Sequence, residues 1–248
     1  MSRLKNLRDL FSLKPRVGSL LLAVSGAVAL GGCAPIPAGP AEYSAGRTRV
    51  VLPTPAWEDL GTTNEALPLQ PGPGAFPLQT RAMALRGARK ELLAVLLVQT
   101  NRTDQPRNHT LWTGGCPQQQ GLMVVDATSA SPVRIDCLRF KRWANNAGWI
   151  EKNHPDVARW MAQHNAAPAQ PYSHLNYRFA TEGGSYVEVN AMVDQRLLRP
   201  KTSNNEEFLR AGQPAHEWSN KVAEAARLST GMVDGFFAVP PFPLPPPQ

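Results

Sequence analysis

The fold is decided by residues 175–193, which read LNYRFATEGGSYVEVNAMV. Apolar side chains alternate with polar ones on both sides of Gly183 and Gly184, which is typical of a β-hairpin with one face turned inward. Gly184 suits the left-handed position that such a loop needs. We therefore predict two antiparallel strands joined by a glycine turn.

The length of the turn sets which residues of this hairpin face each other. A two-residue Gly-Gly loop would place Phe179 opposite Glu188 and mix an apolar with a charged position. A three-residue loop over Glu182–Gly184 instead pairs Phe179 with Val187 and sets Arg178 opposite Glu188. The second arrangement gives one apolar face and a favourable charge pair, and we predict it.

Further strands are predicted on the N-terminal side of the hairpin. Glu91–Gln99 is a nearly continuous apolar run, whose length favours a buried strand although periodicity alone does not exclude a helix. Leu122–Val125 is a short strand candidate, and apolar residues alternate over Val133–Cys137. The Pro/Gly segment Leu67–Pro77 predicts a surface loop that precedes the core.

Helices are predicted at three places. Asn153 and Asp156 resemble a capping pair, so a helix is expected to follow. Asn204 or Asn205 can cap a short second helix, and Pro214 begins the longest one. Strands followed by helices indicate an α+β fold, a mostly antiparallel sheet with helices packed on one face.

The two ends of the chain have their own composition. Residues 1–32 combine basic residues, a short apolar run and small residues, which is typical of a secretory signal peptide. Residues 33–56 are Pro-rich and predict a tether, and residues 239–248 predict a Pro-rich tail that is unstructured or forms polyproline II. A single α+β domain is expected over residues 57–238.

Leu30-Gly31-Gly32-Cys33 resembles the lipobox of bacterial lipoproteins. This resemblance implies that Cys33 carries diacylglycerol and becomes the new N-terminus, so that the protein associates with the membrane through a lipid anchor. Ala34 in place of Asp favours the outer membrane, with the domain facing the periplasm. The alternatives are an uncleaved transmembrane helix, for which the run is shorter than the roughly 20 residues required, and an ordinary thiol at Cys33.

Charge and cysteines narrow the function classes further. The formal charge of the chain is +7, but the signal peptide carries +4 of it, so a nucleic-acid partner is not indicated. Cys116 and Cys137 remain once Cys33 is lipidated, and two thiols in an oxidising compartment favour a disulfide. A loop of this size would stabilise the fold by roughly 3 kcal/mol.

No catalytic or metal motif stands out. The histidines of the chain show no zinc-binding spacing; they are His109, His154, His164, His174 and His216. No cofactor-binding motif appears either. His154, His164 and His174 would form a metal site only if the fold brought them together. We therefore predict no metal and no cofactor.

A basic-aromatic cluster is the one local candidate for ligand contact. Arg139, Lys141, Arg142 and Trp143 would suit phosphate or anionic glycan if they were exposed, although a strand end anchored by its aromatic residue is the plainer interpretation. The tryptophans that lie close in the sequence could line a sugar-binding groove or fill the core; they are Trp143, Trp149 and Trp160.

Three functional hypotheses remain open. The first is a non-catalytic envelope protein that binds a protein or glycan partner. The second is an envelope hydrolase that acts on cell-wall material through His154, His174 and Asp194. The third is a small-ligand carrier with a pocket lined by Tyr172, Tyr177 or the tryptophans. A cleft with strongly shifted pKa values would favour an enzyme, and a deep lined pocket would favour a carrier.

Overall fold

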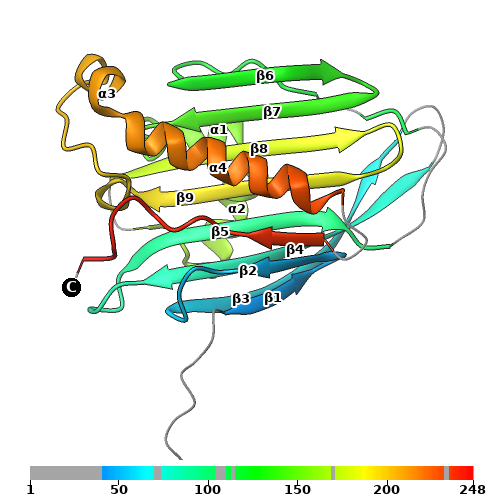
Figure 1. Cartoon of the computed structure of the whole chain (residues 1–248), viewed down its shortest axis with the longest axis horizontal. Coiled ribbons are helices and arrows are strands. Elements are labelled where there is room, and N and C mark those ends of the chain that lie inside the picture. Colours follow the sequence, from blue (N-terminus) through cyan, green and yellow to red (C-terminus); the bar gives the residue numbers. More distant parts are fainter. Residues whose placement is uncertain are drawn as a thin grey trace, which may run out of the picture. The chain divides into compact units, whose positions relative to one another are not determined.

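A seven-stranded antiparallel sheet forms the centre of the molecule (Figure 1). In order across the sheet, its strands are β3 (Trp57–Pro68), β4 (Ala75–Arg86), β5 (Leu92–Asn101), β9 (Tyr186–Asp194), β8 (Tyr172–Thr181), β7 (Arg134–Lys141) and β6 (Val124–Ser131). In the described part of the chain, four α-helices accompany the strands, so the predicted α+β class with a mostly antiparallel sheet is confirmed.

This computed structural model describes residues 41–69, 74–103, 110–112, 115–168, 171–231 and 235–247. They belong to one unit that extends over Ala38–Gln248. The predicted signal peptide and Cys33 lie outside the described residues. Among the described helices, none is long and apolar enough to cross a membrane.

The central hairpin has the predicted register. Phe179 pairs with Val187 and Arg178 with Glu188 along β8 and β9. Gly184 has a φ of 86°, which is the left-handed conformation that the three-residue loop requires. The alternation of apolar and polar residues therefore determines the pairing here, as expected.

One face of the sheet carries the larger apolar core. Helix α4 (Gln213–Ser229) lies along this face in front of β8 and β9 (Figure 1), with α3 (Asn205–Ala211) beside it. Trp218 and Val222 of α4 pack with Val187 and Val189 of β9. This core is continuous from β4 to β7 and stabilises the fold through burial of apolar area.

The opposite face is also covered, so the prediction of helices on one face only was wrong. Helices α1 (Trp149–Asn153) and α2 (Pro155–His164) lie behind the sheet in the view of Figure 1. Val157 and Met161 of α2 pack against Val95, Leu97 and Met192, which alternate with the residues of the first core. The continuous apolar run of β5 reflects this burial on both faces.

A second sheet of three strands begins inside the predicted tether. β1 (Glu42–Ala45) pairs antiparallel with β2 (Thr48–Val51), and β10 (Gly235–Ala238) pairs parallel with β2. Ala45, Val50 and Leu52 are buried in the larger core. Residues 41–56 are therefore part of the folded domain, because their apolar alternation outweighs their prolines.

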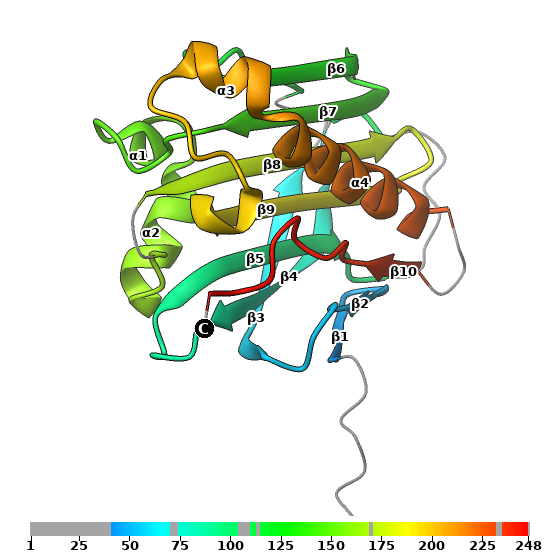
Figure 2. The same ribbon diagram turned by 60° about the vertical axis from the view of Figure 1, so that its left-hand side comes forward.

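Residues 239–247 pack along the domain, which contradicts the unstructured alternative for this tail (Figure 2). Val239 donates its N–H to the carbonyl of Val51 at 2.8 Å, and the Trp218 ring nitrogen donates to the Pro240 carbonyl at 3.2 Å. Phe242 packs against Trp57 and Trp218, at ring distances of 6.2 and 5.1 Å. This proline-rich segment is held by aromatic packing rather than by a ladder of backbone hydrogen bonds.

The predicted caps were right for α3 and wrong for α2. Asn204 Oδ1 accepts the N–H of Glu207 at 2.9 Å and caps α3. Asn153 instead ends α1, where its side chain donates to the Trp149 carbonyl at 2.8 Å. His154 occupies the N-cap of α2 without a side-chain cap, since Pro155 begins that helix.

Two shorter features complete the fold. The predicted loop Leu67–Pro77 is mostly strand, because Leu67 pairs with Phe76 at the end of the long β3–β4 hairpin; residues 70–73 lie outside the described residues. The 3-10 helix η1 (Gln195–Leu198) follows β9 and buries Leu197 and Leu198.

Candidate functional site

A row of polar side chains crosses five neighbouring strands on the α2 side of the sheet. Each member is the Cα partner of the next, in the order Thr63, Thr80, Gln99, Glu188 and Arg178. Side chains at paired positions stand on the same face of a sheet, so these five form one line, which we call the polar row. Such a row requires the register of strands that are far apart in the sequence.

Hydrogen bonds connect the outer part of the polar row. Gln99 Nε2 donates to Glu65 Oε2 at 2.8 Å and to Thr80 Oγ1 at 3.0 Å, and Thr80 Oγ1 donates to Glu65 Oε1 at 3.0 Å. The Tyr186 hydroxyl lies 3.3 Å from Gln99 Oε1. These contacts join β3, β4 and β5 to the ion pair on β9 and β8.

Glu188 is the hub of the network and is 8% exposed. Its carboxylate accepts Arg178 Nη2 at 2.7 Å, the Tyr186 hydroxyl at 2.6 Å and Asn176 Nδ2 at 2.8 Å. Burial alone would raise the pKa of Glu188, but Arg178 and the hydrogen bonds lower it to about 2. Glu188 in turn raises the pKa of Arg178, so the pair is ionised at neutral pH.

A second polar layer lies beside Glu188. Asn176 Nδ2 donates to Asn190 Oδ1 at 3.0 Å, and His174 Nε2 lies 3.1 Å from the same oxygen. Arg139 donates to Asn176 Oδ1 and, at 3.2 Å, to the Pro117 carbonyl. Asn176, Asn190 and His174 are thus each held by a neighbour, which fixes their orientation.

The fold brings together two of the three histidines that were metal candidates. The rings of His154 and His174 are 4.4 Å apart, and His154 Nε2 lies 3.1 Å from Gln119 Nε2. Burial, with a smaller contribution from Arg139, lowers the pKa of His154 to about 4. Burial also lowers the pKa of His174 well below its usual value, so both rings are neutral at pH 7.

The other proposed partners lie elsewhere. His164 stacks on Trp160, at 4.4 Å between ring centroids, and Asp194 binds the Arg196 guanidinium, so neither joins His154 and His174. His216 is exposed on α4, and His109 lies outside the described residues. In the described part of the chain, no three His, Cys, Asp or Glu side chains are grouped to hold a metal ion.

A cavity of about 300 Å³ separates the polar row from the start of α2. It lies over β3, β4, β5, β9 and β8, and the half-buried ring of Trp160 lines it from α2. The residues around it are Thr63, Glu65, Leu67, Thr80, Leu97, Gln99, Asn153, His154, Pro155, Asp156, Val157, Trp160, Arg178, Tyr186, Glu188 and Asn190. The cavity is the best candidate site because the polar network converges on it.

The chemistry of these groups suits binding better than acid–base catalysis. A general acid or base works best with a pKa near the operating pH. Glu188 has a pKa of about 2 and His154 a pKa of about 4, and burial beside Glu188 raises the pKa of the Tyr186 hydroxyl well above its usual value. The groups are fixed donors and acceptors at pH 7.

The predicted basic-aromatic cluster does not form one exposed patch, because its residues alternate between two faces. Arg139 is 3% exposed within the second polar layer. Lys141 donates to the Gly121 carbonyl at 2.8 Å and lies 5.5 Å from the Trp149 ring. Burial lowers the pKa of both cations.

Arg142 joins the loop after β7 to the start of α3. Its guanidinium donates to the Thr202 hydroxyl and to the carbonyls of Thr202 and Asn204, and it is 2% exposed. It also lies 4.0 Å from the Trp143 ring and 4.8 Å from the Phe208 ring. The arginine and the tryptophan together stabilise this corner of the fold, and the burial of the guanidinium leaves it inaccessible to an anion.

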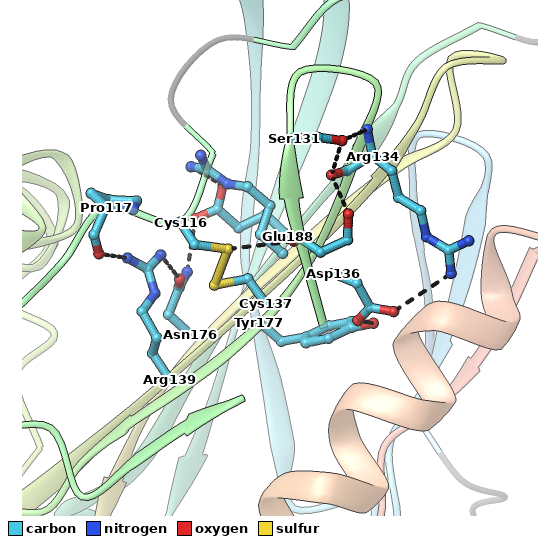
Figure 3. Close-up of a disulfide and its surroundings, with 12 residues drawn as sticks. Cys116, Pro117, Ser131, Arg134, Asp136, Cys137, Arg139, Asn176, Tyr177 and Glu188 are labelled. Atoms are coloured by element: carbon cyan, nitrogen blue, oxygen red, sulfur yellow. Dashed lines mark hydrogen bonds and ion pairs between the residues drawn. A yellow bond between two sulfur atoms is a disulfide. The ribbon is translucent and has the colours of Figure 1, made fainter. Parts of the chain in front are cut away.

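The predicted disulfide is present and holds a loop close to the cavity (Figure 3). Cys116 and Cys137 are bonded, with 6.1 Å between their Cα atoms, and Cys137 is buried as expected. The bond fixes residues 115–123, from which Gln119 contacts His154 and the Gln120 carbonyl accepts Trp149 Nε1 at 3.0 Å. The loop, the disulfide and α1 therefore all support the part of the site around His154.

A second cavity of about 340 Å³ lies on the α4 side of the sheet. The Tyr177 hydroxyl donates to Asp136 Oδ1 at 2.9 Å, and Arg134 lies 4.0 Å from Asp136 Oδ2 (Figure 3). Arg227 of α4 forms an ion pair with the same oxygen at 3.6 Å. Tyr177 thus lines a cavity, as the carrier hypothesis asked, whereas Tyr172 is buried in the core under α2.

Several site residues escaped sequence analysis. The sequence patterns single out the Arg178–Glu188 pair, His154 and Trp160, but they do not identify Glu65, Gln99 or Tyr186 as site residues. One signal was present: Glu188 and Asn190 interrupt the otherwise apolar β9, and buried polar residues need partners. Their own hydrogen-bond partners lie within 16 residues, on β8 and β9, but Gln99, which contacts Tyr186, is 87 residues away from it, so sequence spacing did not reveal the rest of the network.

Comparison of the chain with protein-family models, with curated proteins and with solved structures finds no match. The function is therefore argued from the site itself.

Proposed function

We propose that this protein is a lipid-anchored component of the bacterial envelope that binds a small polar ligand without chemical conversion. Cys33 would carry the anchor in the outer membrane, and the domain would face the periplasm. The signal-peptide pattern of residues 1–32 supports the anchor. The Cys116–Cys137 disulfide is consistent with an oxidising compartment.

The observation that carries the binding function is the cavity with its preformed polar network. Glu188, Arg178 and Tyr186 are held by one another rather than by a ligand, at distances of 2.6 to 2.9 Å. A site whose donors and acceptors are already oriented loses little entropy on binding. Groups that are fixed in charge at pH 7 favour recognition over proton transfer.

The anchor is tested by replacing Cys33 with serine. We expect the wild-type protein to incorporate an alkyne-labelled palmitate, to lack its first 32 residues and to sediment with membranes. Cys33→Ser should lose the label and move to the soluble fraction. An unprocessed N-terminus in the wild type, or membrane association that survives the substitution, would exclude the lipid anchor.

The binding function is tested by filling the cavity. Thr63 is exposed at the rim of the cavity, so the tryptophan of Thr63→Trp should block entry of a ligand. Ala66→Trp is the control, because Ala66 is also exposed on β3 but does not line the cavity. Small molecules released by denaturing protein purified from cells are compared by mass spectrometry. A species retained by wild type and Ala66→Trp but not by Thr63→Trp supports the proposal; identical profiles for all three contradict it.

A further inference from the structure

Resting on the proposed function, we infer that the cavity takes a neutral saccharide, with a sugar ring against Trp160 and its hydroxyls on the polar row. The inference depends on three properties of the lining: its cation is already paired, it mixes fixed donors with fixed acceptors, and the Trp160 ring gives it an aromatic wall.

The lining has three carboxylates, on Glu65, Asp156 and Glu188, and its cation, Arg178, is already paired with one of them. Arg178 and Glu188 lie 2.7 Å apart, and Asp156 is paired with Arg159 at 3.0 Å. The Glu65 carboxylate accepts hydrogen bonds from Thr80 and Gln99 at 3.0 and 2.8 Å. An anionic ligand would meet carboxylates without a free cation in the lining, which disfavours it.

The polar groups of the lining include both the acceptors and the donors that a hydroxyl group can use. A sugar hydroxyl donates one hydrogen and accepts others, so it suits a site where carboxylates stand beside amides and hydroxyls. Gln99, Asn190 and Asn153 bring amides, Glu65 and Glu188 bring carboxylates, and all of them line one cavity. A simple amine would use only the acceptors of this set.

Trp160 provides the apolar surface that the C–H face of a sugar ring requires. Its ring is half-buried, lines the cavity, and is stacked on His164 with an interplanar angle of 18°. This stacking holds the indole in one orientation. Large amphipathic aromatics with a fixed geometry are favourable where one side of a ligand is apolar and its edge is polar.

The size of the cavity limits the ligand. Its volume of about 300 Å³ is at the lower end of known ligand pockets, which range from roughly 300 to 1,000 Å³. Exposed residues, among them Thr63, Glu65 and Pro155, form its rim. A short stretch of a glycan chain is therefore a better fit than a large globular partner.

The test is a binding titration with the full processed chain in a polyoxyethylene detergent, since maltoside detergents carry sugar themselves. The neutral probes are chitotetraose, cellotetraose and maltotetraose, with spermidine as a cationic and citrate as an anionic probe. Each probe is titrated to a concentration of about 10 mM in an isothermal calorimeter, which is sufficient to detect binding with a Kd near 1 mM. We expect at least one saccharide to bind, and spermidine and citrate not to.

Substitutions then locate the binding. Trp160→Ala should weaken saccharide affinity at least about 10-fold, while Trp160→Phe keeps part of it. Trp143→Ala is the matched control, because Trp143 packs on Arg142 outside the lining, and it should bind like wild type. Circular dichroism melting confirms that each variant is folded.

Other outcomes overturn the inference in distinguishable ways. Spermidine or citrate binding without any saccharide would exclude the ligand class and leave the proposed binding function standing. Saccharide binding that is unchanged in Trp160→Ala would place the ligand elsewhere. If no saccharide binds, the inference fails; if in addition no molecule is retained by the cell-derived protein, the proposed function fails as well.

Discussion

The two faces of the central sheet use the same strands for opposite purposes. On the α4 side, β9 contributes Val187, Val189 and Ala191 to a continuous apolar core. On the α2 side, the residues between them are Glu188 and Asn190, which belong to the polar network and the cavity. A single strand thus supplies a core and a site because successive side chains point to opposite faces.

This difference shows how the protein supports buried polar groups. Burying an ion pair such as Arg178–Glu188 costs desolvation energy that its own attraction only partly offsets. The apolar face contributes the compensating stability through burial. The site is therefore expected to be sensitive to changes in its partners, whereas the core is sensitive to lost volume.

The largest effect is expected on the apolar face. Trp218 is 3% exposed and contacts Phe242, so Trp218→Ala should lower the free energy of unfolding by about 4 kcal/mol, because it opens a cavity and releases the C-terminal segment. Urea denaturation followed by circular dichroism measures the loss. Leu209→Ala, at an exposed position, should change stability by less than about 0.5 kcal/mol. Similar values for both variants would contradict the assignment of the core.

On the polar face, Glu188→Gln should cost about 3 kcal/mol, because it leaves the Arg178 guanidinium buried without its carboxylate. The double variant Arg178→Gln/Glu188→Gln should recover part of this loss, since no unpaired charge remains. Glu206→Gln, which removes an exposed pair with Arg210, serves as the control. A double variant that is less stable than Glu188→Gln would show that the charge is not the cause.

The disulfide supports the polar face from one side, and its removal should have a slightly smaller effect. Cys116→Ser/Cys137→Ser should lower the free energy of unfolding by roughly 2 to 3 kcal/mol, since the closed loop has a sequence separation of 21. Hydrogen exchange should increase in residues 115–123. Alkylation of the wild-type protein without reductant provides the control, because two freely modified thiols would rule out the bond.

The smallest expected effect is a pH dependence that originates on the polar face. The folded state lowers the pKa of His154 from 6.5 to about 4, so the unfolded chain binds more protons between these values and stability falls as the pH falls. Between pH 7 and pH 5 the loss from His154 is roughly 2 kcal/mol, and His174 adds to it in the same direction. His154→Gln should reduce the slope and leave the part that His174 contributes, whereas His216→Gln on exposed α4 should leave the slope unchanged. A wild-type profile that is flat in this window would refute the burial of the neutral rings.

Local features could be predicted well from the sequence. The hairpin register followed from the positions of Phe179 and Glu188 around two glycines, and the α3 cap from one asparagine. The prediction of a tether was wrong for residues 41–56, and that of an unstructured tail was wrong as well, because apolar residues between the prolines are buried. Phe242 illustrates the reason: its partners, Trp57 and Trp218, lie far away along the chain.

Local sequence patterns are enough to predict the alternation of β8 and β9, the strand that carries Cys137 and the pairing of the two cysteines of the domain. The three-dimensional fold was needed to show that the sheet is covered on both faces, that Thr80 and Gln99 stand in line with Glu188, and that His154 meets His174. The physical reason is that periodicity and turn chemistry act between neighbours in the chain, whereas a polar row and a cavity arise from the registers of strands whose partners are remote.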